Sequence, residues 1–240
     1  MKWTRNFKIA PTYMQHLIQT PQCPHRRGLL FLVYTLDMAR IRWVVGVDEA
    51  GRGPLAGPVS VAALAFPEPL YAKRAGILHG IRDSKKLTEL GRERWYTKLS
   101  AQAKAGNIKF ASSMVSHSVI DRRGISKATA LGVARTLIKL DLHPATTRVL
   151  LDGSLAAPAL WRNQKTIVRG DDRVAIIAAA SVIAKVRRDR RMKRLSLRYP
   201  DYGFAVHKGY GTASHYRMLK KRGLSLIHRR SFCKKLFPMV

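Results

Sequence analysis

The stretch GVDEAGRGPLAGPV, from Gly46 to Val59, decides how this chain folds. It starts within the apolar run Trp43–Val47, passes two adjacent acids, Asp48 and Glu49, and enters a segment rich in glycine and proline. This pattern predicts a buried strand that carries polar side chains at its end. Adjacent side chains on a strand point to opposite faces, so only the following loop lets both acids reach one object. A divalent metal ion suits that position.

The loop after the acids predicts a surface for a nucleic-acid backbone. Gly51 and Gly53 leave the main chain bare on either side of Arg52. Glycine lets another backbone approach closely, so Gly51–Gly53 suits contact with a sugar-phosphate chain.

The rest of the chain predicts an α/β fold. The strands expected from apolar runs span residues 43–47, 59–66, 108–115, 148–151 and 166–168. Helical spacing predicts a helix over 118–140 that Gly124 interrupts, a long helix from Ile176 to about Arg198, and a last helix from Thr212 to Gly223. Three early strands followed by alternating strands and helices indicate a mixed sheet covered by helices.

Charge points to a polyanionic partner. The 240 residues carry a formal net charge of +31, and 17 lysines and arginines fall between Ser181 and Val240 against two acids. A charge this far from neutral favours a nucleic acid, with binding that weakens as salt rises. The alternatives are a basic proteome or a solvated surface. With 46% hydrophobic residues, the chain is also long enough for one domain with a real core.

Cysteine content and hydropathy exclude other classes of protein. Cys23 and Cys233 lie far apart, which excludes a zinc ribbon and a disulfide framework and favours a reducing, cytoplasmic setting. The longest apolar run, from Val174 to Ala184, is too short to span a membrane and predicts a buried helix, so no membrane partner is expected.

Two further acids stand at element ends. Asp152 follows the apolar run Val149–Leu151, and Asp171 precedes the long helix. If these ends meet those of Asp48 and Glu49, four repelling carboxylates converge, a ligand set that suits Mg²⁺ or Mn²⁺. The alternatives are a turn residue for Asp152 and a helix N-cap for Asp171. The adjacent Asp172 can also exchange roles with Asp171.

Six sequence blocks follow one another between about Ile41 and Arg230: GVDEAGRGPLAGPV, DSKKL at Asp83–Leu87, LLDGS at Leu150–Ser154, RGDDRV at Arg169–Val174, AAASVIAKVRRDR at Ala178–Arg190 and HKGYGT at His207–Thr212. In sequence and in order, these blocks resemble those of the ribonuclease HII family. The resemblance implies a ribonuclease H-like mixed five-stranded sheet flanked by helices, with a C-terminal helical extension. It also implies a metal-dependent endoribonuclease that cuts RNA in RNA–DNA hybrids and at ribonucleotides embedded in duplex DNA. Water attack at phosphorus with departure of the 3′-oxygen would leave 5′-phosphate and 3′-hydroxyl ends. We expect a monomer.

The resemblance also assigns residues. It implies that Asp48, Glu49, Asp152 and Asp171 hold two Mg²⁺ or Mn²⁺ ions, and the ten-residue spacing to Ser181 selects Asp171 over Asp172. It implies that Gly51, Arg52, Gly53 and Tyr210 read the ribonucleotide–deoxyribonucleotide junction. Lys85 and Lys86 suit phosphate contacts.

Each of these substrate residues has a plainer interpretation. Tyr210 is also compatible with an ordinary half-buried tyrosine, and Lys85 and Lys86 with a solvated loop. Asp189 lies among arginines, which predicts an ion pair rather than catalysis. The spacing of His207, His215 and His228 fits no metal-ligand pattern.

The domain organisation follows the blocks. We expect an N-terminal extension over 1–40, a catalytic core over 41–198 and a C-terminal helical substrate-binding extension over 199–240. Met38 is the start that the blocks favour, with an additional packed strand or helix as the alternative for residues 1–37. Rival functions are a ribonuclease HIII-type activity and a non-catalytic basic nucleic-acid binding protein. The carboxylates oppose the second rival, because a phosphate binder gains nothing from clustered acids.

Overall fold

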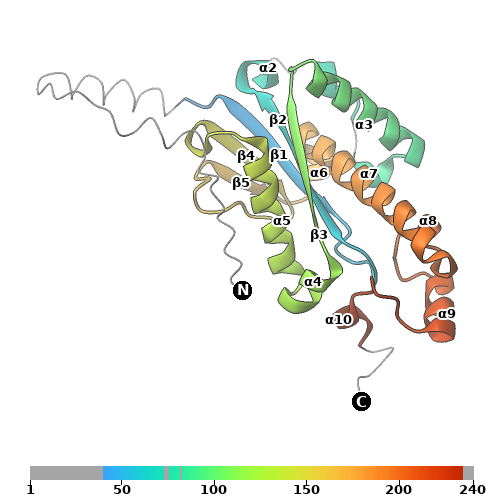
Figure 1. The fold of residues 1–240 in the computed structure, drawn as a ribbon. Helices are drawn as coiled ribbons and strands as arrows, with labels where there is room; N and C mark the ends of the chain where they lie inside the picture. The colour runs from blue at the N-terminus through green and yellow to red at the C-terminus, as the bar shows by residue number, and fades with distance from the viewer. Residues whose placement is uncertain (1–39, 73–75, 82, 235–240) are drawn as a thin grey trace, which may run out of the picture. The chain divides into compact units, whose positions relative to one another are not determined.

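Five strands form a mixed sheet in this computed structural model, which describes residues 40–72, 76–81 and 83–234. The strands lie in the order β3-β2-β1-β4-β5 (Figure 1), with the bounds β1 Trp43–Ala50, β2 Val59–Pro67, β3 Lys109–Val115, β4 Thr147–Asp152 and β5 Gln164–Ile167. β1, β2 and β3 pair antiparallel, whereas β4 runs parallel to β1 and β5 runs parallel to β4. The predicted mixed sheet is therefore confirmed.

The three predicted helical segments are present among the described residues, and five further α-helices were not predicted. The helix bounds are α2 Glu68–Ala72, α3 Glu89–Lys104, α4 His117–Arg123, α5 Ile125–Leu140, α6 Gly170–Arg173, α7 Ala175–Arg198, α8 Phe204–His207, α9 Ala213–Arg222 and α10 Arg230–Cys233. Gly124, at φ 77°, separates α4 from α5, and Thr212 caps α9 as predicted. The sequence did not predict α3, because only Tyr96 and Leu99 of its residues are buried and its apolar periodicity is faint.

The long helix α7 covers one face of the sheet. Ile176 and Ile177 pack there with Val44 of β1. Gly46 makes this close packing feasible, since a Cβ atom at that position would lie 2.4 Å from the carbonyl oxygen of Ile176. The first turn of α7 therefore rests on the backbone of β1, two residues before Asp48.

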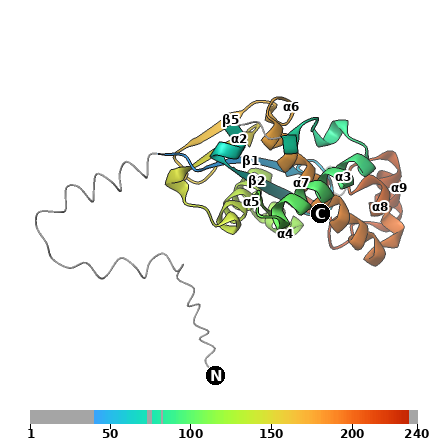
Figure 2. The same cartoon turned by 90° about the horizontal axis from the view of Figure 1, so that it is seen from above.

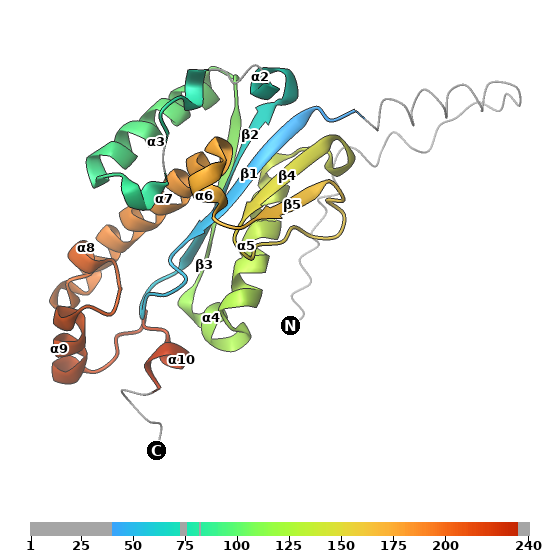
Figure 3. The same ribbon diagram turned by 180° about the vertical axis from the view of Figure 1, so that it is seen from behind.

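The helix α5 covers the opposite face (Figures 1 and 3). Val133 and Leu137 of α5 pack against Val45 and Val47, whose side chains alternate with that of Val44 along β1. Burial on both faces explains why the central strands read as continuous apolar runs.

The C-terminal helices gather beside the end of α7 (Figure 2). Phe204 and Leu219 pack with Met192 of α7 and with Leu55 of the β1–β2 loop. The described residues from Arg40 onward belong to one compact unit, so the predicted division at residue 198 stays a prediction. The N-terminal extension, except Arg40, lies outside the described residues. Within them, no helix is both long and apolar enough to cross a membrane.

Candidate metal centre and neighbouring loops

Three of the four predicted acids meet at one edge of the sheet. Val47 of β1 lies opposite Leu151 of the parallel strand β4, so the next residues, Asp48 and Asp152, come side by side. Asp171 joins them from α6, and one carboxylate oxygen from each of the three lies within 4.8 Å of the others. Oxygen ligands at this spacing suit a hard divalent cation such as Mg²⁺ or Mn²⁺.

Backbone amides orient Asp152 within this group. Its Oδ1 accepts hydrogen bonds from the N–H of Gly170 at 2.6 Å and from that of Asp171 at 3.2 Å. A side chain at position 170 would crowd the site, because a Cβ atom there would lie 2.7 Å from Ile177 Cδ1 and 3.3 Å from Asp152 Oδ1. The short helix α6 therefore presents Asp171 and fixes Asp152 together.

Burial and mutual repulsion of the aspartate carboxylates favour the binding of a cation. Burial, followed by the nearby charges of Glu49 and Asp152, raises the pKa of Asp48 well above its usual range. Burial and the charge of Asp171 likewise raise the pKa of Asp152. A bound cation would relieve both the repulsion and the cost of burial.

Glu49 lies beside this group without joining it. Its Oε1 is 3.7 Å from Arg52 Nε, while Oε2 is buried and has no hydrogen-bond partner. Burial and then the charge of Asp152 raise the pKa of Glu49 against the opposing effect of Arg52. An unpartnered buried carboxylate oxygen is costly, and a cation between Glu49 and the three aspartates would satisfy it.

The structure separates Asp171 from Asp172. Asp171 is 7% exposed and faces the other acids, whereas Asp172 is exposed and forms ion pairs with Lys86 and Arg169. The N-cap interpretation of Asp171 is wrong, because Val174 occupies the N-cap position of the long helix α7 and Asp171 lies inside the short helix α6.

Lys85 comes close to the acids. Its Nζ lies 3.0 Å from Asp171 Oδ2. The loop that carries it is anchored from both sides: Asp83 Oδ1 accepts from the N–H of Lys85, and the Ser84 and Ser181 hydroxyls lie 2.6 Å apart. Burial lowers the pKa of Lys85, but Asp171 and other nearby acids raise it by more. Lys85 therefore brings positive charge to the edge of the aspartate cluster.

The glycine loop, residues 51–58 between β1 and β2, has an open side and a closed side. A Cβ atom at Gly53 would have nothing within 4 Å, whereas one at Gly51, at φ 92°, would lie 1.9 Å from Arg188 Nε. Arg52 is partly exposed beside Glu49. The loop therefore presents bare backbone at Gly53 and rests on Arg188 at Gly51.

Tyr210 borders this loop. Its side chain is 41% exposed, and Arg188 Cζ lies 5.6 Å and Lys185 Nζ 5.9 Å from the ring centroid. The adjacent Gly209 accepts a hydrogen bond of 2.9 Å from the N–H of Leu55, which joins the two loops directly. A partly exposed aromatic ring between cations can stack on a nucleotide.

Some basic residues are internal, which the sequence did not indicate. Arg188 and Arg229 are fully buried, and their guanidinium groups donate to backbone carbonyl oxygens. Both belong to the basic segment from Ser181 to Val240, whose charge predicted the binding of a polyanion. Asp189 pairs with Lys185 and Arg92, so its predicted ion-pair role is confirmed.

The three C-terminal histidines form an unexpected cluster. The rings of His207 and His215 stack at 4.3 Å between centroids, and the His215 and His228 Nε2 atoms lie 3.0 Å apart. Their other ring nitrogens bond backbone groups, so the cluster is a hydrogen-bonded one. Among the described residues, only the cluster of Asp48, Asp152 and Asp171 has the geometry of a metal-ligand set.

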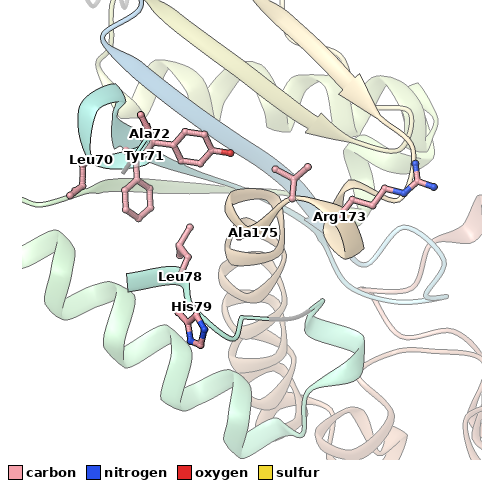
Figure 4. Close-up of a pocket in the computed structure, with 9 residues that line it drawn as sticks. Leu70, Tyr71, Ala72, Leu78, His79, Arg173 and Ala175 are labelled. Atoms are coloured by element: carbon pink, nitrogen blue, oxygen red, sulfur yellow. The ribbon is translucent and has the colours of Figure 1, made fainter. Parts of the chain in front are cut away.

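A separate cavity of about 600 Å³ lies between α2 and the start of α7 (Figure 4). Leu70, Tyr71 and His79 line it together with Arg173. None of the four predicted metal ligands lines this cavity, so its size does not make it the functional site.

Known proteins are similar to this chain in sequence over the segment that contains the carboxylates. The family model described as Ribonuclease HII matches residues 45–235. A ribonuclease HII from Nitrosospira multiformis is 47% identical over 190 residues, covering 79% of this chain and 89% of the relative. A ribonuclease HII from Coxiella burnetii is 43% identical over 189 residues, covering 79% and 87%.

Solved structures share the fold. The ribonuclease H2 from Pyrococcus horikoshii superposes with a TM-score of 0.62 at 27% identity, covering 81% of this chain and 96% of that one. Bst-RNase HIII in complex with Mn²⁺ superposes with a TM-score of 0.56 at 24% identity, covering 77% and 64%. The chain therefore belongs to the ribonuclease HII family, whose members are nucleases that hydrolyse the RNA strand of RNA–DNA hybrids.

Proposed function

We propose that this nuclease also cuts at single ribonucleotides embedded in duplex DNA and that it uses two divalent ions, Mg²⁺ or Mn²⁺. The observation that carries the proposal is the convergence of Asp48, Asp152 and Asp171 oxygens within 4.8 Å. Glu49 completes the proposed ligand set, because its unpartnered buried Oε2 needs a cation. The solved Bst-RNase HIII, which has a similar fold, holds Mn²⁺.

The residues of the proposed site have different roles in the reaction. Asp48, Glu49, Asp152 and Asp171 hold the ions, which when bound activate water and stabilise the leaving oxygen in an in-line displacement. Attack of water at phosphorus with departure of the 3′-oxygen leaves 5′-phosphate and 3′-hydroxyl ends. Asp152 keeps its orientation throughout, because the Gly170 and Asp171 amides hold its Oδ1.

Neighbouring residues select the substrate. The Gly51–Gly53 backbone reads the 2′-hydroxyl, the group that distinguishes RNA from DNA, and the open side at Gly53 supports this role. Tyr210 packs on the deoxyribose that follows the ribonucleotide. Lys85 and Lys86 contact phosphate, with Lys85 exchanging its ion pair with Asp171 for the substrate as the cations neutralise that acid.

One assay tests this function. A DNA duplex with one embedded ribonucleotide is incubated with the protein in Mg²⁺, in Mn²⁺ and in chelator, and the product ends are mapped. We expect a metal-dependent cut on the 5′ side of the ribonucleotide's own 5′-phosphate, with a 3′-hydroxyl on the upstream fragment. Asp152→Asn abolishes the cut but retains duplex binding, while Asp201→Asn, at an exposed acid paired with Arg222, leaves both intact.

The same assay, run in parallel on a long RNA–DNA hybrid, separates the alternatives. Wild-type protein that cuts long hybrids but not the embedded ribonucleotide refutes the finer specificity. Binding without any cleavage in either metal supports the non-catalytic alternative. Cleavage by Asp152→Asn at a near-normal rate shows that the carboxylates are not the metal ligands.

A further inference from the structure

Arg229 binds the glycine loop from the inside. Its guanidinium donates to three carbonyl oxygens of one loop, those of Gly51 at 2.7 Å, Arg52 at 2.7 Å and Gly57 at 3.0 Å. The side chain is 0% exposed, which excludes it as a phosphate ligand. Burial and the nearby Arg188 lower the pKa of Arg229 to about 9, which leaves it protonated at neutral pH.

These bonds set the direction of the loop's other groups. The peptide bonds among the described residues are all trans, so each N–H points away from the C=O of the same peptide unit. The carbonyl groups of Gly51 and Arg52 face Arg229. The N–H groups of Arg52 and Gly53 therefore face away from it and are available to a substrate oxygen.

The backbone around Arg229 adds to this anchor. The N–H of Arg229 donates to Leu55 O at 2.7 Å, and the N–H of Gly57 donates to Ile227 O at 2.9 Å. Figures 1 and 3 show the β1–β2 loop meeting the C-terminal segment at this point. A segment about 170 residues distant in sequence thus fixes the conformation of the loop.

His228 makes the corresponding connection to Tyr210. Its Nδ1 accepts from the N–H of Ser225 at 2.8 Å, so the ring carries its proton on Nε2 and donates to His215 Nε2 at 3.0 Å. His215 then donates from Nδ1 to Tyr210 O at 2.8 Å. The Ser225 hydroxyl also lies 2.8 Å from His228 Nδ1. Because the Ser225 N–H donates to this nitrogen, each ring nitrogen of the chain has one role, as donor or as acceptor, which defines both neutral tautomers.

We propose that the adjacent pair His228 and Arg229 is a positioning device that holds the glycine loop and Tyr210 in a fixed relation without touching substrate. Arg229 holds one reading element and His228, through His215, holds the other. The device rests on the proposed junction-reading function, because it sets the distance between the group that reads the 2′-hydroxyl and the ring that packs on the following deoxyribose.

Matched variants test each half of the device. Arg229→Lys keeps the charge but cannot serve three carbonyl groups in a fork, and Arg230→Met removes the neighbouring exposed arginine side chain as a control. His228→Gln keeps a donor toward His215, whereas His228→Leu removes it. The four variants and the wild type are compared by thermal melting, by amide hydrogen exchange of metal-free protein and by cleavage kinetics.

We expect faster exchange across residues 51–57 in Arg229→Lys and across 209–216 in His228→Leu, with His228→Gln and Arg230→Met close to wild type. A loop displaced by about 1 Å costs roughly 100-fold in rate, so kcat/KM on the embedded ribonucleotide should fall about 10- to 100-fold in Arg229→Lys and His228→Leu. Cleavage within a long hybrid, which has no junction, should fall less.

Two results overturn the proposal: unchanged exchange in both segments, or equal losses on the two substrates. Hydrogen exchange does not depend on cleavage, so it tests the positioning role of His228 and Arg229 even if the wild type fails to cut an embedded ribonucleotide. In that case the proposed function fails separately.

Discussion

Asp171 and Asp172 are neighbours in the chain, yet their carboxylates face different partners. Asp171 turns inward to Asp48 and Asp152, while Asp172 turns outward to Lys86 and Arg169. The salt bridges of Asp172 lower its pKa, chiefly through Lys86. One acid therefore belongs to the proposed metal centre and the other belongs to a surface ion-pair network.

This difference predicts opposite outcomes for two conservative substitutions. Asp171→Asn should reduce the cleavage rate by orders of magnitude, because it removes a proposed metal ligand. Asp172→Asn should change the rate only mildly, because Asp172 faces away from the proposed metal ligands. Its exposed ion pairs also contribute little to stability, so the fold should be retained. Single-turnover cleavage of an RNA–DNA hybrid measures both. The reverse ranking would mean that Asp172 holds the metal.

Replacing Asp48 should stabilise the metal-free protein. The folded-state pKa of Asp48 is raised, so its ionisation destabilises the fold progressively as the pH rises above the ordinary carboxyl range. Asp48→Asn should therefore raise the melting temperature in chelator at pH 7.5, with little gain near pH 4. Adding Mg²⁺ or Mn²⁺ should stabilise the wild type more than the variant. Equal metal stabilisation of both proteins would argue against Asp48 as a ligand.

Acid should weaken the fold through His228. Burial and the neighbouring His215 lower the pKa of His228 to about 4, from an ordinary value of 6.5. The folded state thus keeps the ring neutral while the unfolded state takes up a proton. The stability contributed by the neutral ring is complete above about pH 6.5 and is lost as the pH falls toward 4, by at most about 1.4 kcal/mol per pH unit.

Denaturant melts between pH 7 and pH 4 measure this effect. Other titrating groups near His228 contribute to the pH dependence, chiefly His215, His117 and His207. The comparison is therefore between the wild type and His228→Gln, which has no titrating ring. We expect a shallower loss of stability in the variant, and parallel curves would show that His228 does not titrate in this range.

Tyr210 should matter more at a junction than within a hybrid. Stacking of this kind contributes roughly 1–3 kcal/mol per base. Tyr210→Ala should then slow cleavage at an embedded ribonucleotide by about 10- to 100-fold, at 1.4 kcal/mol per tenfold. Tyr210→Phe should be milder, because it keeps the ring. Equal losses on a junction substrate and a long hybrid would make Tyr210 a structural residue.

The local elements could be predicted from the sequence because their causes are local. Burial on both faces makes β1 and β2 continuous apolar runs, and Gly124 and Thr212 mark helix ends through backbone conformation and capping. The acids at strand ends also pointed to one edge of the sheet, since parallel pairing of β1 and β4 brings Asp48 and Asp152 together.

Other features depended on contacts between residues far apart in the chain. Composition cannot distinguish an arginine that faces solvent from one that, like Arg229, donates inward to three carbonyl groups. Spacing argued only against a shared metal site for the three histidines and did not predict that the turns around α8 and α9 bring them into one hydrogen-bonded cluster.

The sequence by itself determined which chemical groups the protein brings to its site: clustered carboxylates, a bare glycine backbone and an excess of positive charge. The residues themselves left the roles of Asp171 and Asp172 exchangeable, and only the family resemblance selected Asp171; the tertiary structure turns Asp171 inward and Asp172 outward. The tertiary structure alone decided which cations lie in the interior, as Arg188 and Arg229 do. The physical reason is that local patterns set backbone conformation and burial, whereas the direction of a side chain depends on the partner that packing places beside it.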